Sequence, residues 1–107
     1  MDLEDFKKIF VEEVEKYTST ENFFDKEKRT DSVFLARKLY YAMLHIMKTN
    51  SGLAYNKFEI TDRLGMMRSW EYAKDHEEFR RKVNEMADII SKRIKSEQRG
   101  KYISQEK

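Results

Sequence analysis

The chain has 107 residues, which is enough for one small domain and too few for a second catalytic one. Charged and apolar residues each make up 39% of it, so a core can form and the chain is not a disordered tail. The absence of cysteine excludes disulfides, thiolate nucleophiles and Cys-based metal sites, and it favours a cytoplasmic location. With no proline and three glycines, the composition predicts an all-α fold.

Charge is divided unevenly along the chain. Residues 1–32 carry six Lys or Arg and ten Asp or Glu, whereas residues 33–76 and 77–107 each have a net charge of +3. The net positive charge of residues 33–107 is compatible with a polyanionic partner, and ordinary solvated helix faces have a charge of this size as well. The acidic N-terminus is unlike a secretion signal, and the longest apolar run, residues 40–47, is too short to cross a membrane.

Two helices and a connection are predicted for the first half of the chain. Apolar residues spaced three or four apart predict an acidic, amphipathic leader helix over residues 2–18. Residues 18–30 lack this periodicity, so we expect them to form a connection, which contains the pair Phe23 and Phe24. The period resumes over residues 30–47, which we expect to form the best-buried helix.

The sharpest local signal is a capped short helix that ends on a glycine. Asn56 is placed to cap a helix that starts at Lys57, and Glu59 stands at the third helical position, as in a capping box. Gly65 supplies the left-handed residue that ends this helix, and Ser69 is placed to cap the next one. We therefore expect two short, steeply crossed helices, which together form a helix-turn-helix.

A long amphipathic helix is predicted for the C-terminal part. Asp75, with Glu78 three residues later, marks its start, and apolar residues recur at helical spacing as far as Ile94. After Ser96 the chain is polar, and we expect it to fray. The fold is thus expected to be a small domain of four to five helices. The expected division is a leader helix with its connection (1–29), a helix-turn-helix domain (30–96) and a tail (97–107).

No residue pattern points to catalysis or to a metal. His45 and His76 are the only histidines, and neither has a second His or a Cys at ligand spacing. The chain shows no nucleophile with a base and no Gly-rich phosphate loop. We therefore expect a non-enzymatic protein without a cofactor, in which His45 lies in the core or at its boundary.

Two stretches of the chain resemble the C-terminal DNA-binding domain of the bacterial replication initiator DnaA. They are VFLARKLYYAML at residues 33–44 and FEITDRLGMMRSWEYAKDHEEFRRKVNEM at residues 58–86. In that family a helix with a Leu-Ala-Arg segment precedes a short helix ending in Ile-Gly-x-x-Phe-Gly. A recognition helix follows and opens with Arg-Asp-His-Thr-Thr-Val.

The match is partial. Leu35-Ala36-Arg37 fits the first element, and Ile60 with Leu64-Gly65 fits the second. At the third element the chain reads Met66-Met67-Arg68-Ser69-Trp70, so the Asp, His and Thr that read base edges in the family are missing. We therefore do not expect recognition of the initiator's own target sequence.

The resemblance implies a double-stranded DNA-binding protein in replication or transcription control, for which a phage or plasmid origin would fit. The helix from Ser69 to Lys74 would enter the major groove, and basic side chains would hold phosphates. The residues expected to bind DNA are Arg37, Lys38, Lys57, Arg63, Arg68, Ser69, Tyr72 and Lys74.

An alternative is a helical protein-interaction module on the same scaffold. Met66, Met67 and Trp70 are adaptable contact residues, and the leader helix offers a second surface. Trp70 is either a core residue or an exposed contact. Both hypotheses are compatible with a homodimer packed through the leader-helix residues Phe6, Phe10 and Val14.

Overall fold

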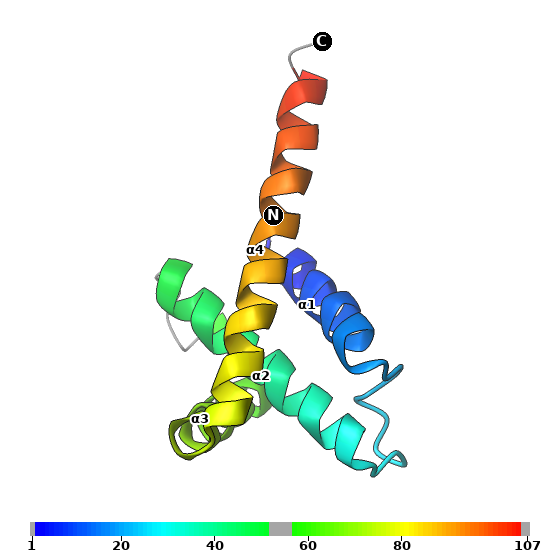
Figure 1. The fold of residues 1–107 in the computed structure, drawn as a ribbon. Coiled ribbons are helices and arrows are strands. Elements are labelled where there is room, and N and C mark those ends of the chain that lie inside the picture. Colours follow the sequence, from blue (N-terminus) through cyan, green and yellow to red (C-terminus); the bar gives the residue numbers. More distant parts are fainter. Residues whose placement is uncertain (1, 52–56, 106–107) are drawn as a thin grey trace.

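The computed structural model describes residues 2–51 and 57–105, which form four α-helices and no strand. The helices are α1 (Leu3–Thr18), α2 (Asp31–Ser51), α3 (Ile60–Asp75) and α4 (Glu77–Gln105). The prediction of an all-α fold with a long C-terminal helix is therefore confirmed. Figure 1 shows α2 crossing the middle of the molecule, and α2 contacts each of the other three helices. None of the helices in the described ranges combines the length and the hydropathy needed to cross a bilayer.

The leader helix α1 begins and ends where the sequence predicts. The Asp2 carboxylate accepts a hydrogen bond from the Asp5 backbone N–H at 2.9 Å, and the Asp5 carboxylate accepts one from the Asp2 N–H at 3.2 Å. Ser19 ends the helix in the left-handed conformation, with φ 52°. Phe10 and Val14, two of the residues suggested for a homodimer contact, are buried within the chain, and Phe6 is partly buried against the same core.

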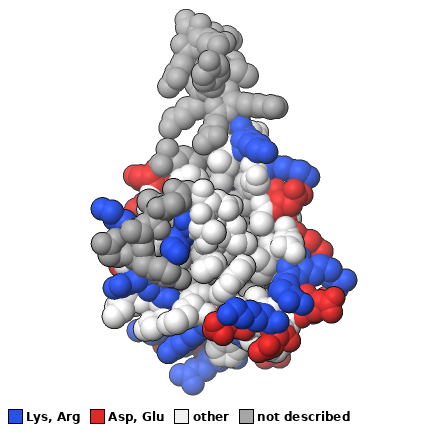
Figure 2. All heavy atoms as spheres, turned by 90° about the vertical axis from the view of Figure 1, so that its left-hand side faces the viewer, with Lys and Arg blue, Asp and Glu red and all other residues white. Residues whose placement is uncertain are grey.

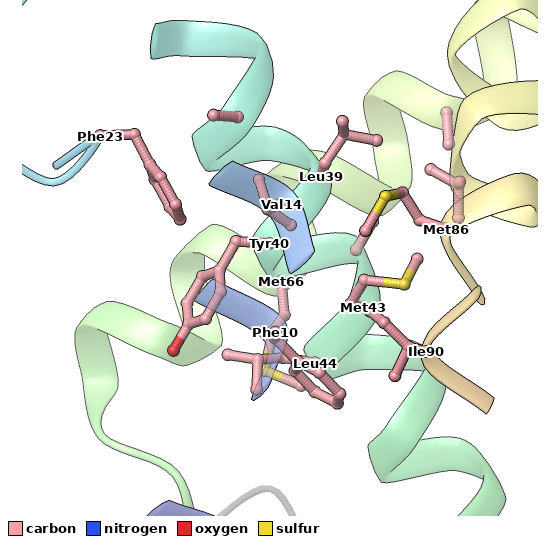
Figure 3. Packing of buried hydrophobic residues seen from close by; sticks show 14 of the residues in the cluster. Phe10, Val14, Phe23, Leu39, Tyr40, Met43, Leu44, Met66, Met86 and Ile90 are labelled. Atoms are coloured by element: carbon pink, nitrogen blue, oxygen red, sulfur yellow. The ribbon is translucent and has the colours of Figure 1, made fainter. Parts of the chain in front are cut away.

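One core unites all four helices. It contains Val14 from α1, Leu39 from α2, Met66 from α3 and Met86 from α4, each less than 2% exposed. Figure 3 shows these side chains converging between the helices. Burying each of them stabilises the fold by about 1.5–3 kcal/mol. The leader helix therefore belongs to the same packed unit as the rest of the described chain.

Polar contacts at the edge of the core fix α1 against α3 and α4. The Lys7 Nζ atom lies 2.5 Å from the Asp62 carboxylate on α3. The Arg93 guanidinium on α4 donates to Glu12 at 2.7 Å and to Glu13 at 3.0 Å. The hydrogen bond from Arg93 lowers the pKa of Glu12 and thereby favours its charged form.

α3 is one continuous helix, so the predicted helix end at Gly65 is wrong, and no turn divides residues 60–74 into two helices. A glycine inside a helix costs about 1 kcal/mol relative to alanine, which a packed helix tolerates. Close approach explains Gly65, because a Cβ atom there would lie 2.6 Å from the Tyr41 ring on α2. Glu59 occupies the N-cap without a side-chain hydrogen bond, and the predicted cap Asn56 lies outside the described residues.

The sharp corner of this region lies at His76 instead. This residue has extended backbone angles, φ −128° and ψ 93°, and separates α3 from α4. Its ring stacks on Tyr72 with 3.7 Å between the centroids, and its Nδ1 atom lies 2.8 Å from the Tyr72 carbonyl oxygen. In Figure 1, α3 is viewed close to its axis while α4 runs in the plane of the picture, so the two helices meet at a steep angle.

α4 continues beyond the point at which we expected the chain to fray. It extends to Gln105, about two and a half turns past Ser96. Between these residues the sequence has no proline and several Glu, Gln, Lys and Arg residues, which favour helix. Figure 1 shows this end of α4 projecting past the other helices.

Candidate functional site

α3 buries one face and exposes large apolar side chains on the opposite one. Its buried residues are Asp62, Met66, Ser69 and Ala73. The spacing of three or four residues aligns the exposed apolar side chains along the helix. We name them the α3 stripe: Ile60 (65% exposed), Leu64 (41%), Met67 (53%) and Trp70 (38%).

Trp70 joins this stripe to α2. Its indole stacks on the His45 imidazole with 4.4 Å between the ring centroids and 25° between the planes. Burial, together with the nearby charge of Lys48, lowers the pKa of His45 and thereby favours the neutral ring. The His45 Nδ1 atom is buried without a hydrogen-bond partner. The stack holds one face of the indole against α2.

A groove opens beside Trp70 where α2, α3 and α4 meet. One hollow of about 260 Å³ is lined by these three helices, and a second of about 380 Å³ is lined by α1, α2 and α4. The two hollows adjoin at Ile46, which lines both, and together they are called the groove. Its apolar lining includes Ile46, Trp70, Val83, Ala87, Ile90 and Ile94.

The charged side chains that line the groove are all cationic. Lys74 and Arg80 line one hollow, and Lys95 lines the other. Lys74 pairs with Glu71 at 2.9 Å, and both side chains are more than half exposed. Arg80 donates to the Lys74 carbonyl oxygen at 3.5 Å, and within the described chain neither Arg80 nor Lys95 pairs with a carboxylate. Figure 2 shows an uncharged band down the centre of one side of the molecule, with charged residues at its margins.

Some of the residues expected to bind DNA are engaged inside the fold. Arg37 donates to the carbonyl oxygens of Phe23 at 2.5 Å and Asp25 at 2.7 Å, so it holds the connection between α1 and α2. The Lys38 Nζ atom lies 3.9 Å from the centroid of the Tyr72 ring. This cation–π contact packs α2 against α3 and occupies both side chains.

The remaining candidates do not form a single exposed face. Lys57, Arg68 and Lys74 are exposed, Ser69 is buried, and Arg63 is half-buried with its Nε atom enclosed and without a hydrogen-bond partner. Arg63 and Arg68 are five residues apart, which places them about 140° apart around the helix axis. Arg63 and Lys74 lie on nearly the same side of α3, Arg68 lies on another side, and Lys57 precedes the helix.

The residues suggested as contacts for a protein partner differ in their exposure. Met66 is fully buried, whereas Met67 and Trp70 are exposed. The rest of the α3 stripe was missed, because the stripe forms only if the helix continues through Gly65. The groove was missed as well, since three helices that are distant in sequence contribute to it.

In the two described ranges, no three His, Asp or Glu side chains are grouped so that they could hold a metal ion. Comparisons with protein-family models, curated proteins and solved structures found no match. The function is therefore inferred from the surface itself.

Proposed function

We propose that the chain is a helical protein-interaction module that binds its partner through the α3 stripe and the adjoining groove. One observation carries this proposal: four large apolar side chains are exposed along one continuous helix. Among the described residues seven large hydrophobic side chains are exposed, and four of these lie on α3. Such clustering differs from the scattered single residues of an ordinary surface.

Covering the stripe would supply binding free energy. Complete removal of a large apolar side chain from water is worth about 1.5–3 kcal/mol, and a half-exposed one contributes a part of this. Met and Trp adapt well to partners, and Trp is frequent among the residues that dominate binding. Arg63, Arg68, Glu71 and Lys74 lie on the same helix and supply the charged rim that protein interfaces usually have.

Site-specific photo-crosslinking tests this proposal. One variant carries a photoreactive phenylalanine analogue at Met67, and a matched variant carries it at Ile89, which is 40% exposed on α4 and does not line the groove. After irradiation in cells, we expect discrete protein adducts from position 67 and none from position 89. Melting curves should show that both variants are folded.

The proposal fails if position 67 yields no protein adduct, or if both positions yield the same set. A Leu64→Glu substitution tests whether the α3 stripe itself contacts the partner, because it places a charge in the stripe at a 41% exposed site. It should abolish the adducts from position 67 while leaving the melting temperature nearly unchanged.

A second candidate function is double-stranded DNA binding in replication or transcription control, which the exposed cations Lys57, Arg68 and Lys74 favour. Glu71 already pairs with Lys74, and Glu77 and Glu78 at the start of α4 are acidic and exposed, so these carboxylates would repel phosphates. We rank DNA second for this reason, and duplex DNA is one arm of the binding experiment below.

A further inference from the structure

We infer that the groove binds an amphipathic helix of another protein whose apolar face is flanked by acidic residues. This inference rests on the proposed function and names the partner chemistry of that site. Three observations carry it: the apolar lining, its length along α4, and the sign of the charges beside it.

The lining has the dimensions of a short helix. Val83, Ala87, Ile90 and Ile94 follow one another at spacings of four, three and four, so they form one stripe along α4. Val83 and Ile90 are mostly covered by the core (3% and 4% exposed), whereas Ala87 and Ile94 are partly exposed. This stripe is about 16 Å long, or three helical turns. Ile46 on α2 lines both hollows, so the two hollows adjoin and form a trough beside the stripe. An amphipathic helix laid into such a trough buries its apolar face along the whole contact.

The charges select an acidic partner. Arg80 and Lys95 are fifteen residues apart on α4, about 22 Å, so they stand near opposite ends of the trough. Lys74 adds a third cation beside Arg80. Its pair with Glu71 is exposed and therefore weak, so a partner carboxylate can compete for it. Among the described lining residues there is no carboxylate to oppose an acidic helix.

The apolar lining favours a protein over a nucleic acid. Duplex DNA gains most of its affinity from contacts between cations and phosphates. The groove instead places the exposed Trp70 and the partly exposed Ile46 and Ile94 among its cations, where a phosphate backbone would leave these apolar side chains uncovered. Rim charges at such a site set partner choice and association rate, while the apolar contact supplies most of the affinity.

Trp70 is the chain's only tryptophan and lines the groove, so its fluorescence reports occupancy directly. The probes are two tryptophan-free peptides of about fifteen residues with the same leucine stripe at helical spacing. One carries Glu on both flanks and the other carries Lys. A third titration uses random duplex DNA. At low salt we expect the Glu peptide to shift the Trp70 emission saturably, and to bind at least about tenfold more tightly than the Lys peptide. Added salt should narrow this difference.

A charge-reversal pair provides the matched control. The double variant Arg80→Glu with Lys95→Glu should invert the preference between the peptides. Arg81→Glu with Lys92→Glu makes the same change in net charge on α4 at residues that do not line the groove, and should leave the preference intact. Both pairs replace charged side chains at exposed positions, so both variants should fold.

The outcomes separate this inference from the proposed function. If both peptides bind equally, or if the two double variants change the preference equally, the inference of an acidic partner is overturned. The groove then remains a docking surface without a charge preference. Binding of neither peptide, with specific adducts from position 67, also overturns it and restricts docking to the α3 stripe. Salt-sensitive binding of duplex DNA that displaces the Glu peptide overturns the inference in favour of the DNA candidate.

Discussion

Gly65 lies where α3 approaches the Tyr41 ring of α2 closely. A Cβ atom at this position would lie 2.6–2.7 Å from three carbon atoms of the Tyr41 ring, closer than side-chain contacts normally come. The ring is half-buried and packs on Phe24 and Tyr40, with centroid distances of 5.9 and 5.2 Å, so its movement is restricted. The glycine therefore serves helix packing rather than helix termination.

Gly65→Ala tests this role. In an isolated helix the change would stabilise by about 1 kcal/mol. Here the added methyl group meets the Tyr41 ring, and overpacking of this kind costs about 1–3 kcal/mol. We expect a net loss of about 1 kcal/mol in the free energy of unfolding, measured by urea denaturation. A second substitution, Tyr41→Ala, should remove the penalty of the first. A stabilised Gly65→Ala variant would contradict the close approach.

At the scale of whole helices, α1 depends on a polar seam with α4. Arg93 donates to Glu12 and Glu13 on α1 and to Glu97 on its own helix. The Tyr17 hydroxyl donates to Glu85, and burial together with this bond raises the pKa of Tyr17 to about 12. The seam lies beside the apolar contacts of Phe10 and Val14 and sets the direction of α1.

Arg93→Gln should make stability less dependent on pH. The hydrogen bond from Arg93 holds the pKa of Glu12 below its ordinary value of 4.5. A carboxylate whose pKa is lowered by folding stabilises the fold above 4.5, and this contribution is lost as the pH falls through the lowered value. The variant should therefore lose about 1 kcal/mol at pH 7, a modest value because the pair is partly exposed, and less in strong acid.

Urea denaturation over a pH series measures this difference. Arg81→Gln is the matched control, because Arg81 pairs with Glu78 on the same helix and both side chains are 66% exposed. It should change stability less than Arg93→Gln does at neutral pH. A loss on Arg93→Gln that is equal at every pH would instead indicate lost packing of the Arg93 stem.

The success of the sequence predictions differed between helices for a physical reason. α1 and α4 each have one apolar face, so the periodic signal placed α1 closely and located the start of α4. α3 has apolar residues on its buried face, such as Met66, and on its exposed face, such as Met67, which blurs the period. With the period blurred, the sequence pattern indicates a helix end at Gly65, which lies near the centre of α3. How α3 is rotated about its axis against α2 depends on the close contact between Gly65 and Tyr41, and these two residues are distant in sequence.

At the scale of the molecule, the candidate surface arises from convergence rather than from a motif. Trp70, Ile46 and Ile90 belong to three different helices and contribute to one groove only because the core brings those helices together. Composition predicted the all-α class, and spacing predicted α1 and the start of α4. They could not predict which faces would remain uncovered, because that depends on how α2 crosses α3 and α4.

Both proposals depend on α3 being a single rigid helix that presents its apolar stripe outward. Amide hydrogen exchange of the purified protein measures this most directly. If α3 is continuous, the amides of residues 65–69 are hydrogen-bonded within it and should exchange as slowly as those of residues 70–73. Fast exchange confined to residues 65–69 would show two short helices joined by a turn, and it would contradict the account.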